Sequence, residues 1–111
     1  MQYRFNQCVL DTAQFSLTRD GRNVDVEPQV LRLLDYLIVH RDRVVPRSEL
    51  FDKVFGRLVT DNALSVRIRS ARAAAGDSAS TQAVIATVGG RGYRFVAPVE
   101  VVSHVAATSK R

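Results

Sequence analysis

The sequence predicts a single α+β domain, and three observations lead to this prediction. Short runs of alternating apolar and polar residues fill the first quarter of the chain, three segments with helical spacing follow, and two apolar runs flank a glycine-rich turn near the end. The length of 111 residues suits one domain, and the shares of hydrophobic (46%) and charged (24%) residues are ordinary for a globular protein. We therefore expect an N-terminal four-stranded antiparallel sheet, three helices and a C-terminal β-hairpin.

The N-terminal sheet is expected from four short runs of strand-forming residues. These runs cover residues 2–5, 9–11, 14–17 and 23–26. Asp20 and Gly21 stand between the last two runs, and an Asp-Gly pair in such a place is a strong signal for a hairpin turn. We expect the four strands to pair in an antiparallel sheet.

Two helices are expected after the sheet. Pro28 stands at a favoured first-turn position, and apolar residues recur at intervals of three and four until about His40. A second, shorter helix is expected over 47–55, where apolar residues again repeat at helical spacing, and Gly56 ends it.

A third helix is expected over about 61–75. Thr60, Asp61 and Asn62 are all good N-cap residues, and Gly76 can adopt the left-handed conformation that ends helices. At ~100° per residue the buried stripe of this helix is narrow and rich in alanine. The stripe consists of Leu64, Ile68, Ala71 and Ala75. Such a helix can pack closely against its neighbours and still present most of its circumference outward.

The last pair of strands is expected over 83–88 and 92–96. Glycines in the connection at 89–91 permit a tight hairpin tip, and Tyr93 and Phe95 are expected to fill the core. The sequence then becomes polar and small, without capped helical patterns. We expect the domain to cover 1–98 and residues 99–111 to form a tail or the start of a linker.

The net charge of +5 is unevenly divided along the chain. Residues 1–55 hold eight basic and eight acidic residues, whereas residues 56–111 hold eight basic and three acidic ones. Such an asymmetry favours a face that binds a polyanion, because Lys and Arg neutralise the phosphates of nucleic acids. Solvated surface charge is the alternative explanation.

The exposed side of the third helix carries side chains suited to reading DNA. Arginine can donate two parallel hydrogen bonds to guanine, asparagine can bind adenine in the same way, and an outward aliphatic group can pack on a thymine methyl. The helical wheel predicts one exposed face with Asn62, Ser65, Arg69 and Arg72, an outward Val66, and Arg67 at the edge near phosphate. Arg91 on the thin hairpin tip can enter a minor groove. Solvation of Arg69 and Arg72 and partial burial of Val66 remain as alternatives.

Catalysis and metal binding are not expected. His40 and His104 are the chain's two histidines, and neither joins a nucleophile or a metal-ligand spacing. The single cysteine, Cys8, fits a reducing compartment. No secretory signal and no apolar run of the ~18 residues needed to span a bilayer is present, so a cytoplasmic location is expected. We expect no catalytic residue, no metal and no cofactor.

The segment 85–95, IATVGGRGYRF, resembles the wing signature of the OmpR/PhoB family of winged helix-turn-helix DNA-binding domains. The resemblance covers about residues 3–98 and is supported by 28–37, by 47–50 and by 66–69 with Arg72. It implies sequence-specific binding of double-stranded DNA by a bacterial transcription regulator, with the recognition helix in the major groove and the wing tip, 89–92, at the minor groove or backbone. The implied DNA contacts are Val66, Arg67, Arg69, Ser70 and Arg72 in the helix and Thr87 at a phosphate.

The sequence departs from the family pattern at several places. Ser70 and Ala73 stand where many members have basic residues, and Gly89 occupies the place of a minor-groove arginine that some members carry. The turn at 56–59 is shorter than the loop that touches RNA polymerase in response regulators, which places that contact in doubt. The domain begins at the first methionine of the sequence, with no receiver domain in front of it. If this methionine is native, we expect the subgroup with an N-terminal reader and a sensory, membrane-anchored or ATPase-like part downstream.

The expected partners are double-stranded DNA, RNA polymerase, a second copy of the chain on repeated half-sites, and further domains of the full-length protein. The alternative function is a winged-helix module that binds proteins without DNA specificity. RNA is a weaker alternative, because no aromatic pair is offered at stacking positions. Salt separates these functions, since DNA affinity falls steeply as salt rises.

Overall fold

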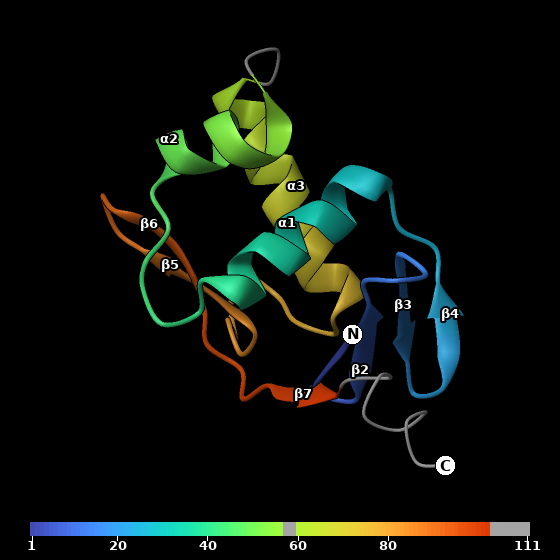
Figure 1. Cartoon of the computed structure of the whole chain (residues 1–111). Coiled ribbons are helices and arrows are strands. Elements are labelled where there is room, and N and C mark those ends of the chain that lie inside the picture. Colours follow the sequence, from blue (N-terminus) through green and yellow to red (C-terminus); the bar gives the residue numbers. More distant parts are fainter. Residues whose placement is uncertain (57–59, 103–111) are drawn as a thin grey trace.

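The structure, a computed structural model, describes residues 1–56 and 60–102. Its strands are β1 (Gln2–Phe5), β2 (Cys8–Asp11), β3 (Ser16–Arg19), β4 (Arg22–Val24), β5 (Ile85–Val88), β6 (Gly92–Phe95) and β7 (Glu100–Val102). Its helical segments are α1 (Pro28–Val39), α2 (Arg47–Leu50), η1 (Phe51–Phe55) and α3 (Asp61–Ala74). Figure 1 shows the helices above one sheet and the β5–β6 hairpin at the side of the domain. The predicted α+β class is confirmed.

The first four strands form the predicted antiparallel meander, but a fifth strand extends it. The strand order is β4-β3-β2-β1-β7, and β7 pairs antiparallel with β1, so that Tyr3 faces Val101. Our boundary at residue 98 was therefore too early, because residues 100–102 belong to the sheet. Residues 100–102 are too few to show a clear alternation of apolar and polar residues. Their pairing with β1 is a long-range contact that local sequence patterns do not reveal.

The turns of the sheet follow from local side-chain chemistry. Asp20 and Gly21 have φ values of 54° and 80°, which is the left-handed pair that the predicted two-residue turn requires. We expected β3 at 14–17, whereas it begins at Ser16. The carboxylate of Asp11 accepts hydrogen bonds from the backbone N–H groups of Ala13 and Gln14 at 2.9 and 3.1 Å. These bonds hold the chain in a turn and delay the strand.

The second predicted helix, 47–55, consists of two parts. One α-helical turn, α2, passes into the wider π geometry of η1, and Gly56 with a φ of 78° ends it. The turn predicted at 56–59 falls partly on residues 57–59, which lie outside the described residues. The first helix ends one residue earlier than expected, and α3 has the expected start.

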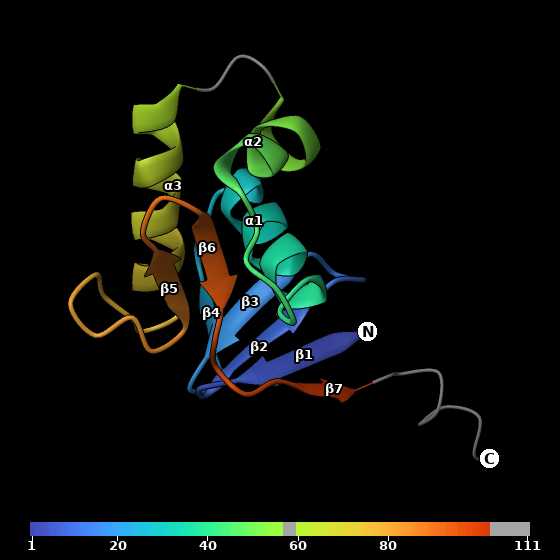
Figure 2. The same ribbon diagram turned by 90° about the vertical axis from the view of Figure 1, so that its left-hand side faces the viewer.

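The core lies between the sheet and the helices, where α1 packs on α3. Leu17 of β3, Leu34 of α1 and Leu64 of α3 are completely buried. Phe5 and Phe95 meet edge to face with their ring centroids 5.0 Å apart, which joins β1 to the hairpin. Figure 2 shows the sheet beneath α1, with α3 beside the β5–β6 hairpin. This packing fixes the exposed side of α3 next to the hairpin.

The β5–β6 hairpin, which we call the wing, docks on the segment before α2. Thr87 pairs with Tyr93 inside the hairpin. The N–H of Val45 donates to the carbonyl of Tyr93 at 2.7 Å, and the N–H of Tyr93 donates to the carbonyl of Val45 at 3.0 Å. A side chain at Gly92 would place its Cβ 2.0 Å from the carbonyl oxygen of Val45. Only glycine permits this close approach, and the base of the wing is therefore held against the helical layer.

Candidate nucleic-acid interface

The N-terminus of α3 is capped by Thr60. Its hydroxyl accepts a hydrogen bond from the backbone N–H of Ala63 at 3.1 Å, which satisfies one of the donors that open a helix. The predicted apolar stripe of α3 is buried against the core: Leu64, Ile68, Ala71 and Ala75 are at most 2% exposed. The packing of this stripe turns the opposite side of α3 to solvent.

That outer side carries most of the predicted reading residues. Asn62, Ser65 and Arg69 are exposed, while Val66 and Ser70 are half-buried. The exposed residues come from three successive turns of α3, so they form one continuous polar strip on the helix. An arginine, an asparagine and a serine in this arrangement can donate hydrogen bonds to the edges of several neighbouring bases.

Arg67 is partly tied to the protein. Its Nε donates to Oε1 of Gln29 at 3.0 Å, and its Nη1 lies 3.9 Å from Oε1 of Glu27. The Arg67 side chain is 26% exposed. It therefore braces α3 against the start of α1 and keeps an accessible edge at the flank of the helix, which suits the predicted contact with phosphate.

Arg72 contradicts the helical wheel. We expected it on the exposed face with Arg69, whereas the residue is only 7% exposed. Its Nε donates to the carbonyl of Ile85 at 3.1 Å, and its Nη2 donates to the hydroxyl of Thr87 at 2.8 Å. A wheel shows only which side of a helix a residue occupies, and here the wing covers the side on which Arg72 lies. The planar fork of the guanidinium suits this double contact.

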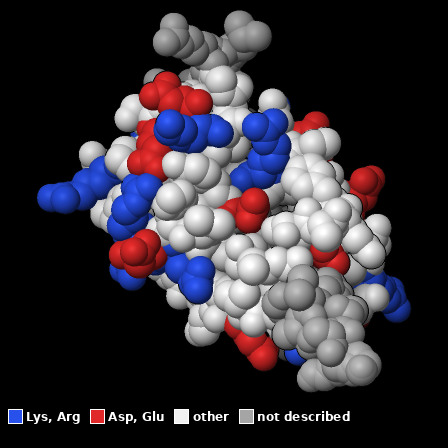
Figure 3. Space-filling view, viewed as in Figure 1, with Lys and Arg blue, Asp and Glu red and all other residues white. Residues whose placement is uncertain are grey.

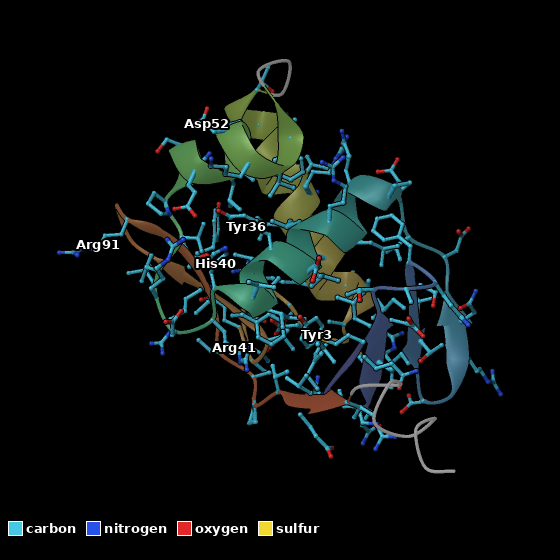
Figure 4. All side chains as sticks on the ribbon, in the orientation of Figure 1. Tyr3, Tyr36, His40, Arg41, Asp52 and Arg91 are labelled. Carbon is cyan, nitrogen blue, oxygen red and sulfur yellow. The ribbon has the colours of Figure 1, made fainter. Side chains whose placement is uncertain are left out.

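The tip of the wing presents a cation to solvent. Arg91 is exposed, and the adjacent Gly90 has a φ of 73°, which allows the tight turn that we predicted. The N–H of Arg91 closes this turn on the carbonyl of Val88 at 2.9 Å. In Figure 4 the side chain of Arg91 points away from the body of the domain, and Figure 3 shows a basic side chain projecting at the same edge.

A groove between the wing and the start of α2 adds a residue that the sequence analysis missed. The groove has a volume of about 330 Å³, and Arg47, Ser48, Thr87 and Arg91 contribute polar groups to its lining. Nη1 of Arg47 donates to the hydroxyl of Tyr93 at 2.9 Å. The sequence showed Arg47 as the first residue of a helix and as part of the matching segment 47–50, but no local pattern places the wing beside it.

A polar cluster joins the end of α1 to α2 and is structural. Arg43 binds both carboxylate oxygens of Glu49, at 2.9 and 2.6 Å, and the hydroxyl of Tyr36 donates to the same carboxylate. These hydrogen bonds from Arg43 and Tyr36 lower the pKa of Glu49 to about 2. Nδ1 of His40 lies 3.3 Å from Nη2 of Arg43, at the rim of the cluster. The carboxylate is thus occupied by structural partners, which gives no support to an acid-base role.

Other chemistry finds little support in the described part of the chain. No three His, Cys, Asp or Glu side chains within residues 1–56 and 60–102 gather closely enough to hold a metal ion. His104 lies outside the described residues. Among the residues that the structure covers, no helix is both long and apolar enough to cross a membrane.

The helices, the exposed polar strip of α3 and the docked wing define the class of winged helix-turn-helix domains. The profile of the family described as "Transcriptional regulatory protein, C terminal" matches residues 21–95. The chain therefore belongs to this family of OmpR/PhoB-type DNA-binding domains. The family is a class of transcription regulators and not a class of enzymes.

Two relatives illustrate the match in sequence. The phosphate regulon transcriptional regulatory protein PhoB of Pseudomonas aeruginosa is 34% identical over 89 residues, which are 78% of this chain and 38% of PhoB. The transcriptional activator CadC of Escherichia coli is 35% identical over 85 residues, which are 75% of this chain and 17% of CadC. The chain thus matches well under half the length of these relatives.

Solved structures show the same fold. The DNA-binding domain of Escherichia coli CadC superposes with a TM-score of 0.77 at 28% identity and covers 91% of this chain and 96% of its own. The DNA-binding domain of Klebsiella pneumoniae RstA, solved in complex with the RstA box, has a TM-score of 0.76 at 24% identity, with 86% and 96% of the two chains covered. At this identity, the likeness to RstA shows the fold alone.

Proposed function

We propose that this chain is the DNA-reading domain of a bacterial transcription regulator and binds double-stranded DNA at specific sequences. The observation that carries this proposal is the exposed polar strip of α3, which ends at Arg69, beside a wing whose tip exposes Arg91. The complex of RstA with its box supports it, because that domain has the same fold. The excess of basic residues in the second half of the chain agrees with a phosphate-rich ligand.

In the proposed complex α3 enters the major groove. Arg69 donates to a guanine edge, Asn62 and Ser65 read neighbouring bases, and Val66 packs on a thymine methyl. Ser70 lies at the edge of this contact, where a hydroxyl can bind either a base or a phosphate.

The groove walls and backbone are contacted from the two flanks of α3. Arg67 and Thr87 bind phosphates, while Arg91 enters the adjacent minor groove or binds the backbone. Arg47 joins them as a further phosphate contact, since it lines the groove beside the wing. Contacts from both flanks fix the register of α3 on the duplex.

The further partners follow from the family. We propose that two copies of the domain bind repeated half-sites, that other domains of the full-length protein supply its signal, and that RNA polymerase is contacted on the promoter. The domain then works in the cytoplasm, where bacterial DNA lies. A membrane anchor elsewhere in the full-length protein is compatible with this function.

Fluorescence-anisotropy titration against random duplexes at two salt concentrations, followed by sequencing of the bound fraction, tests the proposal. We expect salt-sensitive binding and an enriched motif, because each neutralised phosphate adds about −0.9 to the slope of log affinity against log salt. Absence of binding at low salt by folded protein would overturn the proposal and favour a protein-binding module.

The variant Arg69→Ala tests the recognition helix on the selected motif. We expect it to weaken binding by about 1–3 kcal/mol and to flatten the preference at one base position, as for loss of a bidentate base contact. Arg22→Ala is the matched control, because Arg22 is exposed on β4 and loses the same charge. Equal losses in the two variants would show that Arg69 contributes only charge.

A further inference from the structure

The wing is held to the C-terminal part of α3 by Arg72. Arg72 is only 7% exposed, and its guanidinium reaches β5 at two points. Nε donates to the carbonyl of Ile85 at 3.1 Å, and Nη2 donates to the hydroxyl of Thr87 at 2.8 Å. Hydrogen bonds from a charged donor are stronger than neutral ones, and a planar fork leaves little freedom in their direction. The two bonds therefore fix both the distance and the orientation of β5 relative to α3.

Asp77 completes this attachment from the same end of the helix. Its carboxylate accepts the N–H groups of Ala83 at 2.7 Å, Val84 at 2.9 Å and Ile85 at 3.1 Å. The N–H of Asp77 in turn donates to the backbone carbonyl of Arg72 at 2.7 Å. Ile85 is thus held by its carbonyl to Arg72 and by its N–H to Asp77. One charged residue in the last turn of α3 and one just after the helix therefore secure the first residue of β5.

The other strand of the wing is secured separately. Tyr93 of β6 exchanges two backbone hydrogen bonds with Val45, and Arg47 donates to the Tyr93 hydroxyl. The wing base is consequently fixed on both strands, whereas its tip at 89–91 is exposed. The attachment of β5 to α3 is the only one of these links that joins the wing directly to the helix carrying Arg69.

We propose that Arg72 is a positioning residue that sets the spacing between the recognition helix and the wing tip, so that Arg69 and Arg91 contact DNA as parts of one rigid unit. This inference rests on the proposed function. It replaces the base-reading role that the exposed face of the wheel suggested for Arg72. Loss of the hydrogen bonds between Arg72 and β5 leaves α3 folded and lets the wing tip move. The contribution of Arg91 to DNA binding then falls, while that of Arg69 persists.

The first arm of the test uses the protein without DNA. Amide hydrogen exchange is measured for the wild type, for Arg72→Lys, which keeps the charge but not the two-pronged donor, and for Thr87→Val, which removes one acceptor. We expect exchange in β5 and β6 to rise about tenfold, the effect of losing about one charge-assisted hydrogen bond, with β1 to β3 unchanged. Thr18→Val on β3 is the matched control. Unchanged exchange in the wing of both variants would overturn the inference.

The second arm is a double-mutant cycle on the selected DNA motif. The factor by which Arg91→Ala weakens binding is measured in the wild type and in Arg72→Lys. We expect this factor to fall towards one in the Arg72→Lys background, because a mobile tip contributes little, whereas a purely local stabilising role would leave it the same.

The outcomes separate this inference from the proposed function. The inference would be overturned if Arg91→Ala weakened DNA binding by the same factor in the wild type and in Arg72→Lys. It would also be overturned if Arg91→Ala left the affinity of the wild type unchanged, since the wing tip would then make no contact for Arg72 to position. A wild-type protein that binds no DNA would overturn the proposed function together with the coupling, while the exchange measurement would still decide whether Arg72 holds the wing.

Discussion

Replacing Gly92 by alanine should separate the wing from the rest of the domain. Gly92 opens β6 with a φ of 148°, in a region that other residues rarely adopt. A Cβ there would lie 2.0 Å from the carbonyl oxygen of Val45, 2.8 Å from its carbonyl carbon and 2.9 Å from Cα of Pro46. All three are backbone atoms, so no rotation of a flexible side chain can relieve the overlap.

The loss of stability in Gly92→Ala follows from the backbone strain and the hydrogen bonds that are lost. The unusual φ costs about 1–3 kcal/mol for a residue with a side chain. Moving β6 away from Val45 also breaks the two backbone hydrogen bonds between Val45 and Tyr93, each worth about 0.5–1.5 kcal/mol. The expected loss is therefore about 2–6 kcal/mol, which is a large part of the ~5–15 kcal/mol that stabilises a typical domain.

Urea denaturation followed by circular dichroism measures this loss, with Gly90→Ala as the matched control. Gly90 also has a positive φ, 73°, but a Cβ there would have no heavy atom within 4 Å. The control should lose only the ~1–2 kcal/mol cost of a left-handed residue. Amide exchange at Val45 and Tyr93 should rise in Gly92→Ala alone. Equal stability of the two variants would refute the close-contact argument.

Substitutions at three further positions test the supports of the interface. Thr60→Ala should lower the free energy of unfolding by about 0.5–2 kcal/mol through loss of the helix cap, and Thr60→Ser should restore it in urea denaturation. Asp77→Asn should cost about 1.5–3 kcal/mol, because an amide cannot accept on both of its ends; a stability equal to that of the wild type would contradict this. Burial tends to raise the pKa of Asp77, but the backbone N–H donors outweigh this effect and hold the pKa well below 3.8. The stabilisation from the Asp77 carboxylate is therefore complete above pH 3.8 and is lost as the pH falls towards the lower pKa of the folded state. This pH dependence should be missing in Asp77→Asn. The pKa of Glu49 falls from 4.5 to about 2, so its small surface contribution should disappear as pH drops through that interval, and the melting temperature of Glu49→Gln should respond less to acid than that of the wild type. Identical acid responses would show that the Glu49 pair contributes nothing.

Most of the fold could be predicted because its signals are local. The Asp20-Gly21 turn, Pro28 at the start of α1 and the glycines of the wing each act within a few residues of themselves. The strand β7 and the π geometry of η1 could not be predicted in this way. The first depends on pairing with β1, almost one hundred residues away in sequence, and the second on how the short helix packs against α1.

The structure agrees with the expected exposure of most candidate residues but not of Arg72. Asn62, Ser65, Arg69 and Arg91 are exposed as expected, because the buried stripe of α3 and the glycines of the tip determine their direction. Arg72 was placed wrongly because a wheel contains only one helix, and Asp77 went unnoticed because it stands in an irregular loop. Whether a cation faces solvent or β5 is decided by the docking of the wing, which is tertiary packing.

The distribution of arginines shows how charge counting and structure differ. The basic excess of the second half suggested a face that binds a polyanion, yet several of these cations already have partners within the protein: Arg72 binds β5, Arg67 binds Gln29, and Nε of Arg94 donates to the carbonyl of Arg41 at 3.2 Å. Arg69 and Arg91 remain as exposed cations on α3 and the wing tip, on two elements whose relative position the buried cation Arg72 controls. A buried arginine that orders two exposed ones contributes to recognition through geometry, because a rigid pair of contacts selects the spacing of groups on its ligand as well as their charge.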